Sequence, residues 1–125
     1  MKISALQLSL IVTLGVLLTF SGCSNGGPPE PLSPDRAITE LTRAFAKSKP
    51  EMKEAAGRVV AALQVKNYTN ASALLMQLSS AQGLGAKERD VASRAKIGVN
   101  QLLQEAQAKG DQQSAEYLRQ VRQAK

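Results

Sequence analysis

The chain has 125 residues but no histidine, no tryptophan and a single cysteine. The lack of histidine excludes a serine–histidine–aspartate triad and a histidine-ligated zinc site, and one cysteine cannot build a disulfide framework within the chain. Aromatic residues make up only 3% of the sequence, so the core must be small and built from Leu, Val and Ala. That scarcity also disfavours nucleic-acid binding, because single-stranded sites stack bases on aromatic rings.

The acidic and glycine residues show no pattern that carries catalysis. Glu51 and Glu54, and likewise Glu88 and Asp90, lie in the first turns of predicted helices, where carboxylates stabilise the helix dipole. The stretch Gly83-Leu84-Gly85 lacks the Gly-Lys of a phosphate-binding loop, and an Asp-rich calcium loop is absent. We therefore expect no enzyme activity, no cofactor and no metal site.

The first 23 residues carry the sequence's most specific pattern. Lys2 precedes an apolar stretch at 6–20, and Phe20-Ser21-Gly22-Cys23 follows. Small residues ahead of a cleavage point let the extended backbone fit a peptidase. The pattern resembles the lipobox of bacterial lipoproteins. That resemblance implies cleavage between Gly22 and Cys23, loss of the signal peptide 1–22, and diacylglycerol and palmitate chains on Cys23.

An uncleaved transmembrane helix is the alternative reading, since the apolar run approaches the necessary length. Glycines and prolines break the run sharply after Gly22, and no basic flank follows until Arg36, which favours the lipoprotein. Such lipoproteins carry two or three acyl chains, which make a durable membrane anchor. In enterobacterial lipoproteins an Asp after the cysteine tends to retain the protein at the inner membrane. By that analogy Ser24 predicts a cell-envelope protein on the outer membrane, facing the periplasm.

The remainder divides into a linker, a helical domain and a tail. Residues 23–33 form the lipidated cysteine and a flexible linker that extends about 30 Å at most, because it is rich in Gly26, Gly27, Pro28, Pro29 and Pro31. The helical domain is predicted at 34–110. Residues 111–125 form a weak C-terminal helix or tail, capped by Asp111.

Apolar spacing and capping residues predict the helices. Ser48-x-x-Glu51 is interpreted as a capping box for the second helix, and Leu75 and Leu102 lie at the centres of apolar stripes. Short turns between successive helices imply antiparallel neighbours. The fold class is therefore all-α, a small antiparallel bundle of four to five helices. The expected ranges are 34–47, 48–65, 68–81, 86–109 and a fifth after 111.

The segment 66–78 resembles the turn and second helix of a tetratricopeptide-type hairpin. Tyr68 matches the aromatic residue that closes the turn, Ala71 the small residue at the helix crossing, and Leu75 the apolar residue one turn later. Stable arrays of such hairpins need about three units, and the chain holds at most one. The resemblance therefore implies a helical-hairpin bundle and not a solenoid.

Two apolar residues lie out of phase with their helices. Met76 lies about 140° from its stripe, and Ile97 lies nearly opposite the stripe centre of its helix, at about 100° per residue. They pack against another helix of the chain, or they form a partner surface, for which Met is well suited. Both interpretations stay open at this point.

The formal net charge is +6, and +5 once Lys2 is removed with the signal peptide. Cations on the predicted fourth helix flank its apolar stripe on both sides, which is typical of a solvated face. We expect a protein-interaction or scaffold module that is anchored by lipid and binds a protein partner. The alternative is a structural tether in which the basic segment 119–125 contacts peptidoglycan or anionic lipid. Lys125 resembles the peptidoglycan-linked end of the major outer-membrane lipoprotein.

Overall fold

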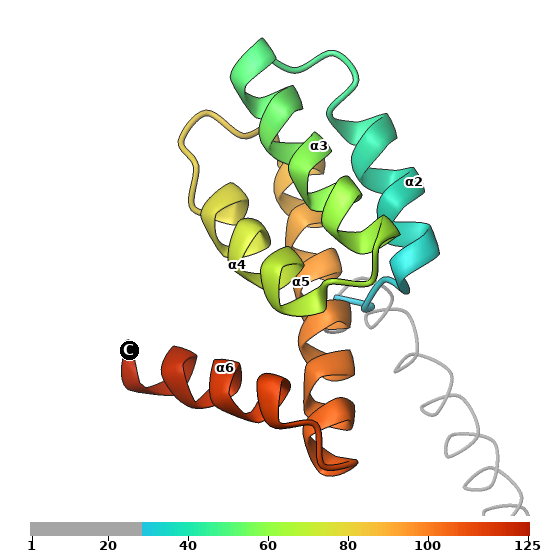
Figure 1. The fold of residues 1–125 in the computed structure, drawn as a ribbon. Coiled ribbons are helices and arrows are strands. Elements are labelled where there is room, and N and C mark those ends of the chain that lie inside the picture. The colour runs from blue at the N-terminus through green and yellow to red at the C-terminus, as the bar shows by residue number, and fades with distance from the viewer. Residues whose placement is uncertain (1–28) are drawn as a thin grey trace, which may run out of the picture.

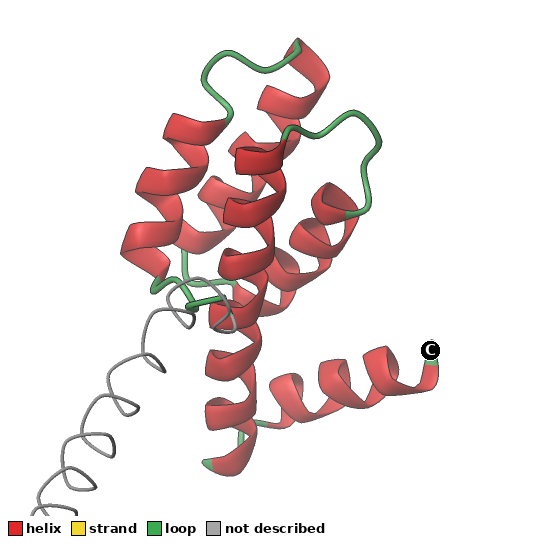
Figure 2. Cartoon of the chain, turned by 180° about the vertical axis from the view of Figure 1, so that it is seen from behind, coloured by secondary structure: helices red, strands yellow, loops and turns green. Residues whose placement is uncertain are grey.

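A computed structural model describes residues 29–125, so the predicted signal peptide, Gly22 and Cys23 lie outside the described part of the chain. The described residues contain helices and turns but no strand, which confirms the all-α prediction (Figure 2). The five helices are α2 (Pro34–Ala44), α3 (Pro50–Gln64), α4 (Tyr68–Ser79), α5 (Ala86–Ala108) and α6 (Gln112–Gln123).

Helices α2 to α5 form an antiparallel four-helix bundle. Each packs on its neighbour along the chain, and α5 closes the ring by packing on α2 as well as on α4 (Figure 1). Helix α5 has 23 residues and α4 has 12, which at 1.5 Å per residue are about 35 Å and 18 Å long. The C-terminal turns of α5 therefore project beyond the bundle, and α6 packs sideways against this projection.

The interior is small and aliphatic, as expected. Phe45 is the largest buried side chain, and Leu75 is 0% exposed, as its stripe predicts. On α5 the first half of the predicted stripe is buried, with Val91 and Ala95 at 2% and 0% exposed. Further along the helix Leu103 is 2% exposed, while Leu102, the predicted stripe residue, is only half-buried. The reason is that α5 packs on three other helices, so its buried face is wider and turned relative to one stripe. The buried α5 residues are Val91, Ala92, Ala95, Gly98, Val99 and Leu103.

The start of α3 differs from its prediction. Pro50 occupies the first helical position, so Lys49 is the N-cap and no side chain caps the helix. Ser48 therefore lies one residue too early for a capping box. Its hydroxyl instead donates a 2.6 Å hydrogen bond to Glu88 Oε2 at the start of α5.

Glu88 joins the two turns at this end of the bundle. Its Oε1 accepts from the backbone N–H of Gly85 at 2.9 Å, while Oε2 accepts from the Ser48 hydroxyl. These two hydrogen bonds, the one from Ser48 first, lower the pKa of the Glu88 carboxyl below its ordinary value. Glu88 lies in the first turn of its helix, as predicted, and in addition bonds to Ser48, which is 40 residues away in the sequence.

The predicted flexible linker is packed where the structure describes its end. Leu32 is 1% exposed, and its backbone N–H donates to the Arg94 carbonyl at 3.1 Å. Arg94 Nε in turn donates to the Glu30 carbonyl at 2.8 Å. Gly98 makes room for this segment, since a Cβ there would lie 1.9 Å from the Leu32 carbonyl oxygen. We call residues Glu30–Ser33 the strap. The strap belongs to the folded domain, although the Pro and Gly content predicts a flexible linker up to residue 33.

Candidate functional site

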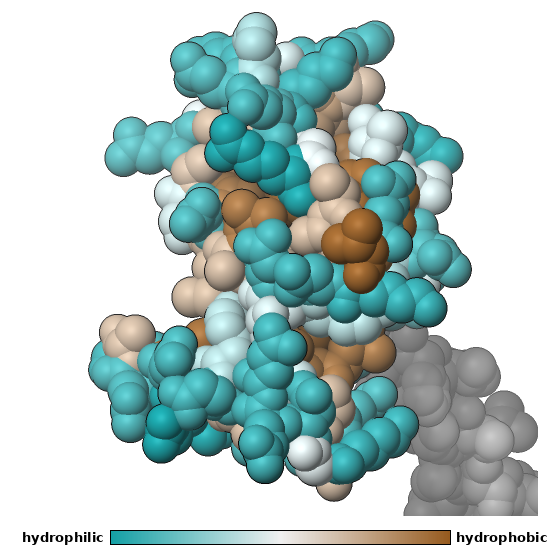
Figure 3. Space-filling view, viewed as in Figure 1, coloured by the Kyte–Doolittle hydropathy of each residue, from teal (hydrophilic) through white to brown (hydrophobic). Residues whose placement is uncertain are grey.

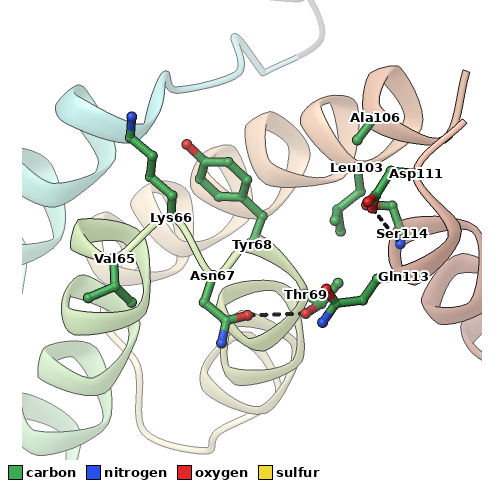
Figure 4. Close-up of a pocket in the computed structure, with 10 residues that line it drawn as sticks. All are labelled: Val65, Lys66, Asn67, Tyr68, Thr69, Leu103, Ala106, Asp111, Gln113 and Ser114. Atoms are coloured by element: carbon green, nitrogen blue, oxygen red, sulfur yellow. Dashed lines mark hydrogen bonds between the residues drawn. The ribbon is translucent and has the colours of Figure 1, made fainter. Parts of the chain in front are cut away.

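An open pocket of about 420 Å³ lies in the angle between the bundle and α6 (Figure 4). We call it the elbow pocket. Residues 65–69, in the turn between α3 and α4, form one side, and Asp111 to Ser114 form the other. Leu103 and Ala106, on the projecting part of α5, form the wall between them.

The two turns that face the elbow pocket have the same construction. Lys66 and Gly110 both adopt positive φ, at 58° and 93°, so each ends its helix in the left-handed conformation. Asn67 and Asp111 follow, and each donates its backbone N–H to the carbonyl five residues earlier. Each then caps the next helix, accepting from the backbone N–H three residues later, at 3.2 Å for Asn67 and 2.8 Å for Asp111.

Lys66 occupies a position that normally favours glycine, because a Cβ is strained at positive φ. Its neighbour Val65 is 73% exposed, the most exposed large apolar side chain described. An apolar side chain and a cation thus stand together at the rim of the elbow pocket. Strained and exposed residues of this kind concentrate where proteins bind ligands.

The lining of the elbow pocket is suited to hydrogen bonding. It offers the side chains of Asn67, Thr69 and Gln113 together with the Asp111 carboxylate. Hydrogen bonds from Ser114 lower the pKa of Asp111 below its ordinary value, so that carboxylate is an acceptor at neutral pH. Among the residues that the structure describes, no group of three acidic or cysteine side chains could hold a metal ion.

A partly buried polar network joins α6 to α4, and α4 to α5, beside the elbow pocket. The Tyr117 hydroxyl of α6 donates to Ser72 Oγ of α4 at 2.9 Å, and Ser72 Oγ donates to Asn100 Oδ1 of α5 at 3.0 Å. Ser72 is 1% exposed and Leu118 of α6 is 9% exposed. The segment after Asp111, predicted as a weak helix or tail, is thus a helix joined to both neighbours, and the angle of the elbow is defined.

The residues proposed from sequence as a partner surface occupy different settings. Met76 is 39% exposed, and its Sδ lies 3.8 Å from the Tyr117 hydroxyl, so it borders α6. Ile97 is half-buried on α5. Neither lines the elbow pocket, and their role as a partner surface stays a prediction.

The basic segment 119–125 is helical through Gln123. The Arg119 guanidinium pairs with Glu116 in the same helix, which raises the pKa of Arg119 and lowers that of Glu116. Part of the cationic character of this segment is therefore balanced within α6.

Sequence reasoning missed the elbow pocket, although part of its signal is local. Lys66-Asn67 and Gly110-Asp111 each pair a turn residue with a helix cap, which predicts two helix boundaries. The two turns face each other because α5 is long and α6 packs against its end. No local sequence pattern predicts this arrangement.

Among residues 29–125, none of the helices combines the length and the apolar character that a membrane span requires. Comparison with family models, curated proteins and solved structures finds no match to this chain.

Proposed function

We propose that this protein is a lipid-anchored interaction module of the bacterial cell envelope, which binds a partner protein at the elbow pocket. The anchor is supported by the Phe20-Ser21-Gly22-Cys23 pattern, in which Cys23 would carry the lipid. The outer membrane, on the side that faces the periplasm, is the proposed location, by the analogy drawn for Ser24. We propose no catalysis, cofactor, metal or nucleic acid for this module.

The observation that carries the binding role is the elbow pocket. It is wide and open, and its hydrogen-bonding groups come from two rigidly capped turns. Val65 supplies an exposed apolar contact beside them. Surfaces that combine an apolar contact with oriented polar groups bind short protein segments, in which backbone amides and carbonyls require partners.

The strap determines how the anchor would hold the module. With Glu30 and Leu32 bound to α5, six residue steps separate Cys23 from Pro29, which span about 20 Å at full extension. The chain reaches the bundle at the end that carries the elbow pocket. The proposed binding surface would therefore lie on the membrane-proximal side of the module.

The anchor is tested by labelling cells with radioactive palmitate. The Cys23→Ala variant is expected to lose the label and to accumulate as an unprocessed precursor, because no other cysteine exists to accept the diacylglycerol. A Ser24→Ala variant, changed at the adjacent position, is expected to keep full labelling. Equal labelling of Cys23→Ala and wild type would rule out the lipoprotein assignment.

The binding role is tested by site-specific photo-crosslinking in growing cells. A photoreactive residue at Gln113, within the elbow pocket, is expected to form a discrete adduct with an envelope protein. The control is Gln82, which is also exposed but lies in the turn between α4 and α5 at the other end of the bundle. Adducts of the same pattern from both positions, or none from Gln113, would contradict binding at the elbow pocket.

A further inference from the structure

The fold explains four of the five glycines that the structure describes. Gly83 and Gly110 have positive φ, and Gly98 faces the strap. Gly85 is an N-cap, a position at which glycine is well tolerated. Gly57 lies in the interior of α3, where glycine is less stable than alanine, and a Cβ there would meet nothing within 4 Å. No contact within the described part of the chain explains why position 57 is a glycine and not a residue with a side chain.

Gly57 lines a second recess, a groove of about 190 Å³ between α2 and α3. Its walls are mostly apolar and include Leu41 and Phe45 from the α2 side and Ala56 and Val60 from α3. Apolar surface is visible where these two helices lie side by side, surrounded by hydrophilic side chains (Figure 3). A glycine in such a wall lets the backbone of a second molecule approach closely.

The end of this groove is strongly cationic. Lys53 lines it, and the adjoining segment 43–53 contains four Lys or Arg residues and only one acidic residue, Glu51. All four cations are exposed. A partner that fills the apolar groove would therefore meet a positive potential at one end, which attracts acidic groups.

We propose that the groove between α2 and α3 binds an acidic amphipathic helix of a partner protein. Its apolar side chains would enter the groove, its backbone would pass close to Gly57, and its Asp and Glu residues would face Lys53 and its neighbours. Binding of an amphipathic helix in a groove between two helices combines these contacts in a single element. The inference rests on the proposed interaction role and on the proposed lipid anchor, but not on the elbow pocket.

The geometry favours a protein over the anchoring membrane as the occupant. The chain joins the bundle at the start of α2, whereas the cationic segment 43–53 lies at the other end of α2 (Figure 1). An anionic headgroup of the membrane that holds Cys23 would have to reach past the length of the bundle. A free polyanion would use the charges but leave the apolar groove unfilled.

The test is a selection from a displayed library of random peptides, each about 16 residues or roughly four helical turns long. The full chain is presented in nanodiscs of zwitterionic lipid, and protein-free nanodiscs remove peptides that bind lipid. Selected peptides are expected to be acidic, with apolar residues at intervals of three and four. Their dissociation constants are then measured for wild type and five variants.

Gly57→Gln is expected to weaken binding at least about tenfold, as loss of a central contact does, while its thermal stability does not fall. Ala61→Gln, one turn later on α3 and outside the groove, should bind as wild type. Lys53→Glu should weaken binding in low salt, whereas Lys109→Glu, in the turn between α5 and α6, should not. The pair Gly57→Gln and Ala61→Gln distinguishes contact with the groove from an effect on helix stability. The pair Lys53→Glu and Lys109→Glu distinguishes a local charge contact from an effect of net charge.

Recovery of no peptide would overturn the groove, whereas the interaction role at the elbow pocket is decided separately by crosslinking from Gln113. Peptides that bind Gly57→Gln as tightly as wild type, or that lack acidic residues, would overturn the groove alone. If Gln113→Arg in the elbow pocket abolished their binding instead, the interaction role would stand and the groove would not. Binding to anionic vesicles but to no peptide would identify a lipid as the occupant and reject the proposal.

Discussion

Truncation of Leu75 or Leu103 to Ala is expected to lower the free energy of unfolding by about 2–5 kcal/mol, the range for a buried leucine that leaves a cavity. The two side chains are 0% and 2% exposed and belong to the hydrophobic core. Chemical denaturation monitored by circular dichroism measures the effect. A domain of this size has a total free energy of unfolding of roughly 5–10 kcal/mol. Each substitution therefore removes a large share of that stability.

The matched control is Leu102→Ala, at the neighbouring position on α5. Leu102 is only half-buried and lines an open recess between the strap and α5. Its truncation is therefore expected to destabilise the protein much less than Leu103→Ala does. Equal destabilisation by Leu102→Ala and Leu103→Ala would mean that the buried face of α5 has been placed wrongly.

Replacement of Gly98 by Ala is expected to destabilise the protein by about 1–3 kcal/mol, the cost of an added methyl group in a packed site. The new Cβ would lie 1.9 Å from the Leu32 carbonyl oxygen, so the strap must move away from α5. Gly57→Ala, also in a helix, meets no neighbour within 4 Å and is expected to gain up to about 1 kcal/mol from helix propensity.

Hydrogen exchange distinguishes loss of the strap from general unfolding. In Gly98→Ala the Leu32 amide, which donates to the Arg94 carbonyl in the wild type, is expected to lose protection. Amides in the middle of α3 and α4 should keep most of theirs. Retained protection at Leu32, with an unchanged free energy of unfolding, would show that the close approach at Gly98 is not a real constraint.

Local rules predicted the five helices and most of their boundaries, apart from the end of α2 and the start of α3. Pro34 and the capping residue Ser33 define the start of α2, and the capping residue Asp111 defines the start of α6. The last residues of α4 and α5 lie within two residues of their predicted ends. These features depend on contacts within one or two turns, which a single sequence carries. The same is true of Leu75, whose apolar spacing places it in the core.

The contacts between residues that are distant in the sequence could not be predicted from local patterns. Ser48 fits a local capping box, but its hydroxyl bonds to Glu88, 40 residues away. Pro and Gly content indicates a flexible segment up to residue 33, yet Leu32 is buried against α5. The elbow pocket and the groove at Gly57 arise from the same kind of packing between distant elements. Gly57 was visible in the sequence, but its significance depends on knowing that no neighbour fills the space.

The strap also determines how the molecule responds to mechanical load. Tension applied to the chain ahead of Pro29 falls first on the bonds that hold Glu30 and Leu32 to the middle of α5, and only after their rupture on the first turn of α2. Because α5 contacts α2, α4 and α6, the force spreads into three helices before any of them is peeled from its end. Under load on the chain ahead of Pro29, the strap is therefore expected to detach first, while the bundle and α6 stay folded.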